Sequence, residues 1–419
     1  MPLLHVLAEV LRDEKTEVQQ RTERMAEAGE CAGKFAWVRR STSLANAGIE
    51  NISHKQITAC RIMVGPAKVC AYRLIQFSTA IRFMGNLRQI AMVCGFAALA
   101  GCGGDTLEQF GGPTMGSTYS IQYVRSSTAP APKELQRQVE SILGDVDRQM
   151  STYRSDSDIE RFNNLPANSC QPMPAPVLQL VRTGEQLSQA SAGAFDLTVE
   201  PLLNLWGFGP QARQLRVPDA ATLAQVRQRV GHQHLRIDGE QLCKDAAVEV
   251  DFNSIAAGYA VDRIAELLTG LGIHHYLAEA TGELKAAGHK PDGSPWRVAL
   301  EEPRDDQRVA ERVINVDGFG VSTSGDYRNY FQQDGRRYSH TLDARTGAPI
   351  THQLASVTVL HPSALMADGL STLLLILGPE QGWDYAEQHQ VAAFFVLREG
   401  DAFVTRSNQA FEQLTAVKP

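Results

Sequence analysis

Apolar residues recur at helical spacing in several stretches of the chain, and these stretches predict helices with a buried face. The clearest covers residues 133–150, where apolar side chains repeat on one side. Other helices are expected around 177–187, from the N-cap Asp219 to Gly231, and over 255–272. Two more are expected near 365–377 and 380–389.

Shorter apolar runs lie between these helices and predict strands. Most of them do not alternate strictly between apolar and polar residues, which is typical of strands buried on both faces. Helices mixed with such strands favour an α+β fold with residues 110–417 as one folded unit. The predicted strands cover residues 119–124, 276–280, 296–301, 312–316, 356–361 and 392–397.

Composition places this unit among folded globular proteins. Of 419 residues, 43% are hydrophobic and 21% are charged, which is ordinary for a globular domain. The formal net charge is −7 and no basic stripe stands out, so nucleic acid is excluded as the main partner.

The N-terminal region has a different character. Residues 84–101 resemble a signal peptide, with Arg88 ahead of an apolar run too short to span a bilayer. The run ends Leu99-Ala100-Gly101-Cys102, which is similar to a bacterial lipobox, so a lipid anchor on Cys102 and a tether over 102–110 are expected. The predicted location is the bacterial cell envelope, as a membrane lipoprotein facing the periplasm. The outer membrane is favoured, because Gly103 gives no acidic retention signal.

Residues 1–83 would then lie ahead of a signal peptide. We interpret them as untranslated upstream sequence, with translation starting at Met84. The alternative is a genuine cytoplasmic or disordered extension. In an exported protein Cys170 and Cys243 could form one disulfide. The sequence leaves open whether these two cysteines lie close together.

Two segments carry the candidate chemistry. Asp368 and Thr372 are four residues apart, so on a helix their oxygens share one face, as a Mg²⁺ site would need. Asp251 begins the segment DFNSIAAGYAVD (251–262), where a helix start offers free N–H groups to an anion. A cation beside an anion site indicates phosphate chemistry. The alternative is that Asp368 and Ser254 are ordinary helix caps.

Further motifs accompany these two segments in a fixed order, and together they resemble the ApbE family, the FAD:protein FMN transferases. The resemblance covers about residues 110–400. The further motifs are GPTMGSTY (112–119), DRQMSTY (147–153), SDIERFN (157–163), GAFDLTVEPLLNLWGFG (193–209), VSTSGDYR (321–328) and HTLDARTG (340–347); the segment with Asp368 and Thr372 itself reads ADGLST (367–372).

The resemblance implies a mixed α/β unit related to the T-fold, with the flavin site in a central cleft. The implied activity is Mg²⁺-dependent transfer of FMN from FAD to a Ser or Thr hydroxyl of an acceptor redox protein, releasing AMP. Two alternatives share the same site: an FAD pyrophosphatase, in which water replaces the acceptor, and a flavin-holding lipoprotein without catalysis.

The resemblance also implies roles for individual residues. His340 is the expected base for the acceptor hydroxyl, and Trp206 and Phe208 are expected to pack in the core. Ala257 stands where the family often has a charged residue, and Thr281-Gly282-Glu283 stands where Gly-Gly-Glu is usual. The metal ligands would be Ser254, Asp368 and Thr372, and the FAD contacts Met115, Tyr153, Ala194, Phe195, Asp196, Asp251, Ala257 and Thr341.

Overall fold

The computed structural model describes residues 106–212, 214–400 and 402–416. The predicted signal peptide, Cys102 and residues 1–83 lie outside the described residues. Among the helices that are described, none is both long enough and apolar enough to cross a membrane.

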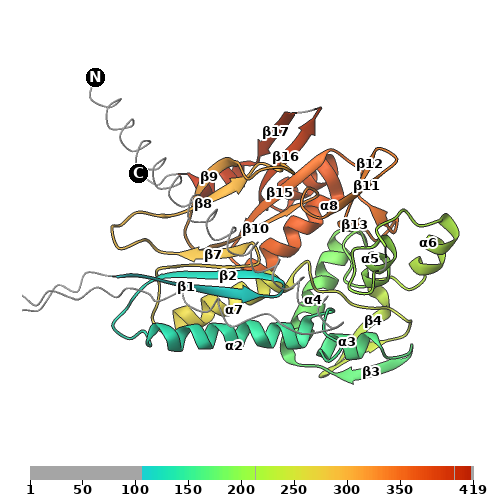
Figure 1. Ribbon diagram of the computed structural model, residues 1–419, viewed down its shortest axis with the longest axis horizontal. Helices are drawn as coiled ribbons and strands as arrows, with labels where there is room; N and C mark the ends of the chain where they lie inside the picture. The colour runs from blue at the N-terminus through green and yellow to red at the C-terminus, as the bar shows by residue number, and fades with distance from the viewer. Residues whose placement is uncertain (1–105, 213, 401, 417–419) are drawn as a thin grey trace, which may run out of the picture. The chain divides into compact units, whose positions relative to one another are not determined.

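An eight-stranded antiparallel sheet forms the centre of the described unit (Figure 1). Its first strand begins at Leu107, inside the segment predicted as a tether, because residues 107–114 pair along their whole length with the next strand. In spatial order the strands are β1 (Leu107–Thr114), β2 (Ser117–Val124), β6 (Tyr276–Ala280), β7 (Glu283–Ala287), β10 (Phe319–Gly325), β15 (Leu354–His361), β16 (Ala392–Glu399) and β17 (Ala402–Ser407).

Three helices cover one face of this sheet: α2 (Pro132–Met150), α7 (Ala256–Gly270) and α8 (Ala364–Gln388). Their apolar sides join inward residues of the sheet, such as Ile121, Ala278 and Val357, in the main core. The opposite face carries the hairpin of β8 (Trp296–Glu301) and β9 (Ala310–Val316) together with α9 (Gln409–Thr415). The α+β prediction is therefore confirmed as a mixed α/β unit with one large sheet.

A second group of elements lies beside the helices at one end of the sheet (Figure 1). Part of this group has a small core of its own, which contains Trp206, with Phe208 packed against it, as predicted. The apolar residues within 159–162 and 177–187 belong instead to the main core. The group comprises α3 (Asp158–Asn163), α4 (Ala175–Ala190), α5 (Glu200–Trp206), α6 (Ala220–Arg227), η1 (His232–His234), β3 (Ser169–Pro172), β4 (Leu235–Asp238), β5 (Gln241–Lys244), β11 (Tyr330–Gln333), β12 (Arg336–Ser339), β13 (Leu342–Asp343) and β14 (Ala348–Pro349).

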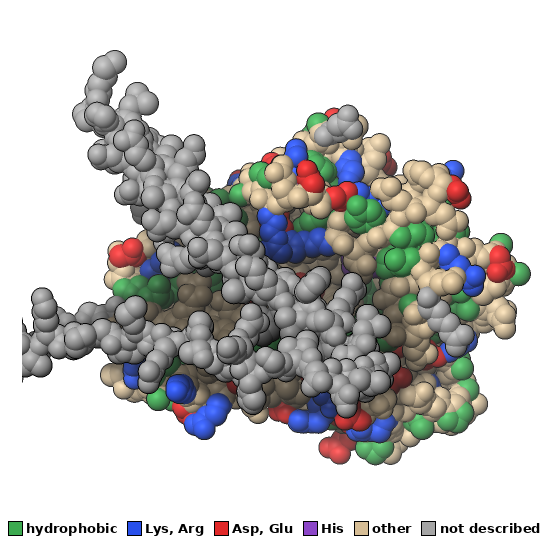
Figure 2. Space-filling model, viewed as in Figure 1, with side chains coloured by type: hydrophobic (Ala, Val, Ile, Leu, Met, Phe, Trp, Pro, Cys, Tyr) green, Lys and Arg blue, Asp and Glu red, His purple; other side chains and the backbone are tan. Residues whose placement is uncertain are grey.

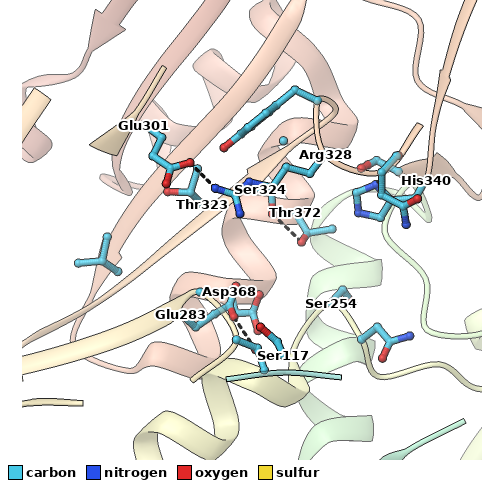
Figure 3. Close-up of a pocket in the computed structure, with 18 of the residues that line it drawn as sticks. Ser117, Ser254, Glu283, Glu301, Thr323, Ser324, Arg328, His340, Asp368 and Thr372 are labelled. Atoms are coloured by element: carbon cyan, nitrogen blue, oxygen red, sulfur yellow. Dashed lines mark hydrogen bonds and ion pairs between the residues drawn. The ribbon is translucent and has the colours of Figure 1, made fainter. Parts of the chain in front are cut away.

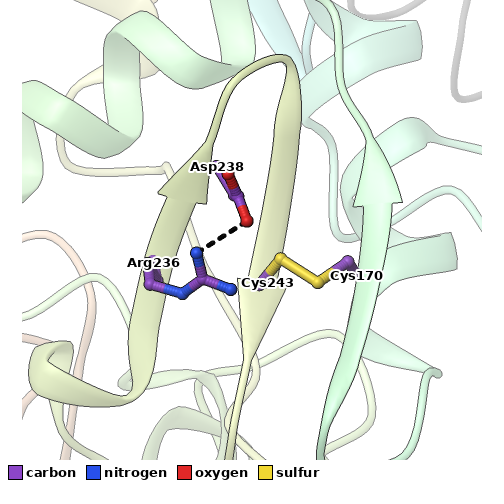
Figure 4. The surroundings of a disulfide bond; sticks show 4 residues. All are labelled: Cys170, Arg236, Asp238 and Cys243. Atoms are coloured by element: carbon purple, nitrogen blue, oxygen red, sulfur yellow. Dashed lines mark hydrogen bonds and ion pairs between the residues drawn. A yellow bond between two sulfur atoms is a disulfide. The ribbon is translucent and has the colours of Figure 1, made fainter.

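A disulfide between Cys170 and Cys243 joins two strands of the small sheet β3-β5-β4 (Figure 4). The two cysteines are direct cross-strand partners, with an S–S distance of 1.97 Å, although 73 residues separate them in the chain. The pairing that the sequence left open is thus present in the structure.

The predicted elements match the structure with two differences in the helices. The predicted break between 377 and 380 is a kink inside α8, where Gly378 adopts φ 82° and Pro379 follows. The helix capped by Asp219 ends at Arg227 rather than near Gly231. After Arg227 the chain continues in turns whose hydrogen bonds join residues three apart, such as the Arg229 N–H and the Val226 oxygen.

Asp262 ties the start of α8 to α7 and to the sheet. Its carboxylate accepts hydrogen bonds from the Ser363 hydroxyl (2.6 Å) and from the Ala364 and Leu365 N–H groups (2.9 and 3.0 Å), and it pairs with Lys285 at 2.8 Å. Burial alone would raise the pKa of Asp262, but these donors hold it below its ordinary value. The carboxylate therefore stabilises the helix start on which the candidate site depends.

We expect Asp262→Ala to lower the free energy of unfolding by about 2–4 kcal/mol, since it removes a helix cap and a charge-assisted pair. Urea denaturation measures this. The matched control is Glu266→Ala on the same helix, whose side chain is 61% exposed and which should change stability by only about 0.5 kcal/mol. The difference between the variants should shrink in acid, because the stabilisation is lost as the pH falls through the lowered pKa. Equal stability of the two variants would contradict this role for Asp262.

Candidate active site

One cavity of about 690 Å³ gathers residues from separate parts of the chain (Figure 3). A cavity of this volume can hold a large organic ligand. Arg308 and Arg328 line it, and Figure 2 shows basic side chains at the upper edge of a hollow in this face. Both arginines pair with Glu301, on the edge of the cavity. The other lining segments are the start of β2, residues 195–199 with Leu203 of α5, residues 251–254, the β6–β7 turn, β8, β10, residues 340–342 and α8.

Two carboxylates meet at one corner of this cavity, Asp368 from α8 and Glu283 from the start of β7 (Figure 3). Burial raises the pKa of Asp368 well above its ordinary value, and the charge of Glu283 adds to the effect. Removal from water likewise raises the pKa of Glu283 to about 7. No ion pair of either carboxylate occurs within the described part of the chain. Such a corner attracts a cation.

Hydroxyl groups surround this corner. Ser322 and Ser324 alternate on β10, so both side chains face α8. The Ser322 hydroxyl lies 3.5 Å from Asp368 Oδ1, and the Ser324 hydroxyl lies 2.9 Å from that of Thr372. Asp368 and Thr372 therefore share one face of the helix, as their spacing predicts.

This donor set fits a hard cation such as Mg²⁺, which prefers oxygen ligands and keeps several waters. Among the described residues no three His, Cys, Asp or Glu side chains gather as a metal cluster. Asp368 and Glu283 would therefore be the charged ligands, and hydroxyls, substrate oxygens and water would complete the set.

Asp368 also has a structural contact. Its Oδ2 accepts a hydrogen bond of 2.9 Å from the Gly258 N–H, in the first turn of α7. A side chain on residue 258 would collide with Ala364 and with the Asp368 Cβ, so glycine permits this close approach of the two helices. The N-cap of α8 is Ser363, so Asp368 caps a neighbouring helix rather than its own.

Ser254 lines the same cavity just before α7, but Figure 3 shows it apart from the carboxylate corner. The N-cap position of α7 is Ile255, which makes no side-chain capping bond. In the first turn of α7 the Gly258 N–H donates to Asp368 and the Ala256 N–H to the Phe252 oxygen, so few donors of this helix start remain for an anion.

His340 lies on another wall of the cavity, directly after β12 (Figure 3). Its Nδ1 lies 3.2 Å from the backbone oxygen of Asn329. A carbonyl only accepts, so Nδ1 carries the proton and Nε2 keeps a free lone pair. Burial lowers the pKa of His340, which keeps the ring neutral at pH 7. A neutral imidazole in a cavity can accept a proton from a substrate hydroxyl.

Phe195, Asp196 and Thr341 line the cavity as well. Phe195 is buried, so only a small part of its ring reaches a ligand. The Asp196 carboxylate accepts hydrogen bonds from Thr198 and from the His232 N–H at 2.7–2.8 Å. Its oxygens are therefore engaged in holding the loop.

Asp251 is buried at the edge of the cavity before α7. The backbone N–H and side-chain amide of Asn253 donate to its two oxygens at 2.6 and 2.8 Å. Burial raises the pKa of Asp251 to about 6. Burial, with the charge of Asp251, also raises the pKa of Glu200 to about 8. With a pKa of about 6, the Asp251 carboxyl group can serve as hydrogen-bond donor or acceptor towards a flavin ring.

The ApbE family model matches residues 115–395. The chain belongs to the ApbE family.

Two relatives named FAD:protein FMN transferase give the level of similarity. The one from Vibrio cholerae is 41% identical over 316 residues, which cover 75% of this chain and 95% of that protein. The one from Escherichia coli K12 is 36% identical over 306 residues, which cover 72% and 87%. The apo crystal structure of the Pseudomonas stutzeri flavinyl transferase is 61% identical, with a TM-score of 0.71, and the match covers 75% of this chain and 98% of that one. The chain is thus an enzyme of the flavin-transferase class.

Four residues predicted to contact FAD are not part of the cavity lining: Met115, Tyr153, Ala194 and Ala257. Met115 sits in the β1–β2 turn, next to Ser117, which does line the cavity. Tyr153 is 66% exposed, and desolvation together with the charges of Asp251 and Glu200 raises its pKa. Their contacts with FAD stay predictions for this ApbE member.

Sequence reasoning missed several residues of the cavity. Glu283 was noted only in the variant Thr281-Gly282-Glu283, and Ser324, with the buried Ser322 beside it, only as part of a motif. Alternating serines in VSTSG were a usable signal for one polar strand face. Arg328 likewise stood only inside the motif VSTSGDYR (321–328), and Glu301 and Arg308 carried no recognisable pattern.

Proposed function

We propose that this ApbE-family enzyme transfers FMN from FAD to a Ser or Thr hydroxyl of another protein, with Mg²⁺, and releases AMP. The observation that carries the proposal is the pairing of sites in one cavity: the carboxylates of Asp368 and Glu283 at one corner, and the free Nε2 of His340 on another wall.

The acceptor oxygen bonds to the phosphorus on the FMN side of the FAD pyrophosphate, and the bond from that phosphorus to the bridging oxygen breaks. AMP leaves with the bridging oxygen, and the hydroxyl proton passes to His340 Nε2. Because an alcohol is a weak nucleophile, a positioned neutral base contributes directly to the rate.

Mg²⁺, when bound, supplies positive charge to the pyrophosphate oxygens. The chain itself contributes Arg308 and Arg328 on the cavity wall. These groups orient the phosphates before reaction.

An FAD pyrophosphatase would use the same cavity with water as nucleophile, and a flavin carrier would hold FAD unchanged. Incubation with FAD and Mg²⁺, with and without a candidate acceptor protein, separates the three. We expect AMP to form in proportion to protein-bound flavin. AMP with an equal amount of free FMN would indicate a pyrophosphatase, and retained FAD with no AMP would indicate a carrier.

We also propose that the mature protein is a lipoprotein of the bacterial cell envelope, anchored through Cys102 and facing the periplasm, with the outer membrane preferred. The Leu99–Cys102 sequence and a disulfide of the kind formed in oxidising compartments support this.

Expressed from Met84 in bacteria, the protein should fractionate with membranes and carry lipid on Cys102. Cys102→Ser should block both processing and lipidation. The matched control is Cys94→Ser, inside the apolar run, which should be processed normally. An intact unlipidated chain starting at Met1, detected by mass spectrometry of the natural protein, would overturn the proposal.

A further inference from the structure

A second cavity, of about 590 Å³, shares no lining residue with the candidate active-site cavity, called the flavin cavity below. It is formed by Asp326, by β12 with residues 336–339, by residues 350–353, and by Arg398 from β16. The reaction proposed above uses none of these groups.

Positive charge predominates in this second cavity. Its wall contains Arg336, Arg337 and Arg398 but only one carboxylate, Asp326. Arg398 holds Asp326 through two hydrogen bonds of 2.6 and 2.7 Å. Arg337 pairs with Asp305, outside the wall, so the arginines still exceed the carboxylates by one (three against two).

Two of the three arginines, Arg337 and Arg398, are held in place, whereas Arg336 is exposed. The two ion pairs fix Arg337 and Arg398, and the Arg337 guanidinium also lies 3.8 Å from the centre of the Tyr330 ring. A guanidinium carries more N–H donors than one bidentate carboxylate occupies, so both retain donors. Arg336 makes no ion pair within the described residues, which leaves its charge uncompensated.

A buried hydroxyl in the same wall also lacks a partner. Ser339 is 2% exposed and its Oγ makes no hydrogen bond in the described structure. A buried polar group without a partner costs free energy, and an acceptor bound in the cavity would remove that cost.

We propose that this second cavity binds an oxyanion, a phosphate or carboxylate group, through Arg336, Arg337 and Arg398, with Ser339 as a further donor. Arginine suits both groups because its planar donors match their oxygens. The oxyanion is either a free phosphate compound or a side-chain carboxylate of a bound polypeptide.

The cavity backs onto the active site. Ser339 precedes His340, and Asp326 precedes Tyr327, which lines the flavin cavity. A bound oxyanion would therefore lie against the two segments that carry the proposed base and the edge of the flavin site.

The test is calorimetric titration of the full chain, saturated with FAD in EDTA, with inorganic phosphate and separately with a hexaglutamate peptide at constant ionic strength. We expect saturable binding of at least one probe. Arg336→Gln should weaken it about tenfold, the effect of losing one charge-assisted hydrogen bond, and Ser339→Ala should weaken it by a smaller factor. Both changes leave the two ion pairs intact.

The matched control is Arg236→Gln, an exposed arginine of the small sheet paired with Asp238, which should bind as the wild type does (Figure 4). Saturable binding of phosphate would show that a free phosphate compound is sufficient as the ligand. Binding of hexaglutamate alone would show that the ligand is an acidic polypeptide. The proposal is overturned if neither probe binds saturably, or if Arg336→Gln binds the active probe as tightly as the wild type.

Discussion

Asp368→Asn should reduce FMN transfer by about 10²–10³-fold, the range seen when a group that stabilises developing charge is removed. Asp368 is a buried carboxyl group whose pKa is raised by burial and by the neighbouring Glu283, and in its ionised form it would supply negative charge to a bound cation. Asparagine keeps an oxygen that can accept from the Gly258 N–H, so the contact between α7 and α8 survives while the charge is lost.

A thermal readout tests the same residue without turnover. In the metal-free protein, Asp368→Asn relieves repulsion with Glu283, so its melting temperature should equal or exceed that of the wild type. The rise in melting temperature with Mg²⁺ should disappear. In the wild type, Mg²⁺ affinity should increase as the pH rises through about 7, because the Glu283 proton competes with the cation.

Thr372→Ala is the matched control on the same helix face, and its effect should be milder because water can replace a neutral ligand. If Asp368→Asn keeps the wild-type response to Mg²⁺ in both assays, Asp368 is only a cap for α7.

His340→Ala should slow transfer by about 10²-fold or more, the usual effect of losing a general base. The affinity for FAD should change little, since the ring is held by Asn329 rather than by a phosphate contact. Stopped-flow measurement with saturating FAD separates the chemical step from binding.

The pH profile gives a second test of His340. Burial lowers its pKa, so wild-type activity should fall only below the ordinary histidine pKa of about 6.5, as the base becomes protonated. The alanine variant should lose this acidic limb. Unaltered turnover and an unaltered profile in the variant would assign the base role to another group.

Local patterns predicted most of the fold. The strands at 276–280 and 296–301 have the predicted bounds, and α2 and α7 begin and end within a few residues of the prediction. These elements carry apolar side chains at regular spacing, because each buries one face or both in a core.

Strand β10 was not predicted, although it is central in the sheet. Its serines point at hydroxyl-bearing residues of α8 instead of an apolar core, so its sequence lacks the usual hydrophobic signal. Edge strand β1, with Gly111 and Gly112, lacked that signal for a different reason: none of its residues is fully buried.

The sequence likewise predicts only some of the contacts in the candidate site. Asp368 and Thr372 could be paired from sequence, since four residues of helix bring their oxygens to one face. Glu283 could not, because only the β6–β7 turn and the packing of α8 bring it to Asp368. The Cys170–Cys243 bond likewise depends on the register of β3 with β5.

The most direct test of the proposed function is the intact mass of an acceptor protein after incubation with the enzyme, FAD and Mg²⁺. We predict a mass increase of one FMN less water, mapped by peptide fragmentation to a single Ser or Thr, with AMP formed in equal amount. An acceptor of unchanged mass, with AMP and free FMN accumulating together, would contradict transfer and show that water is the nucleophile.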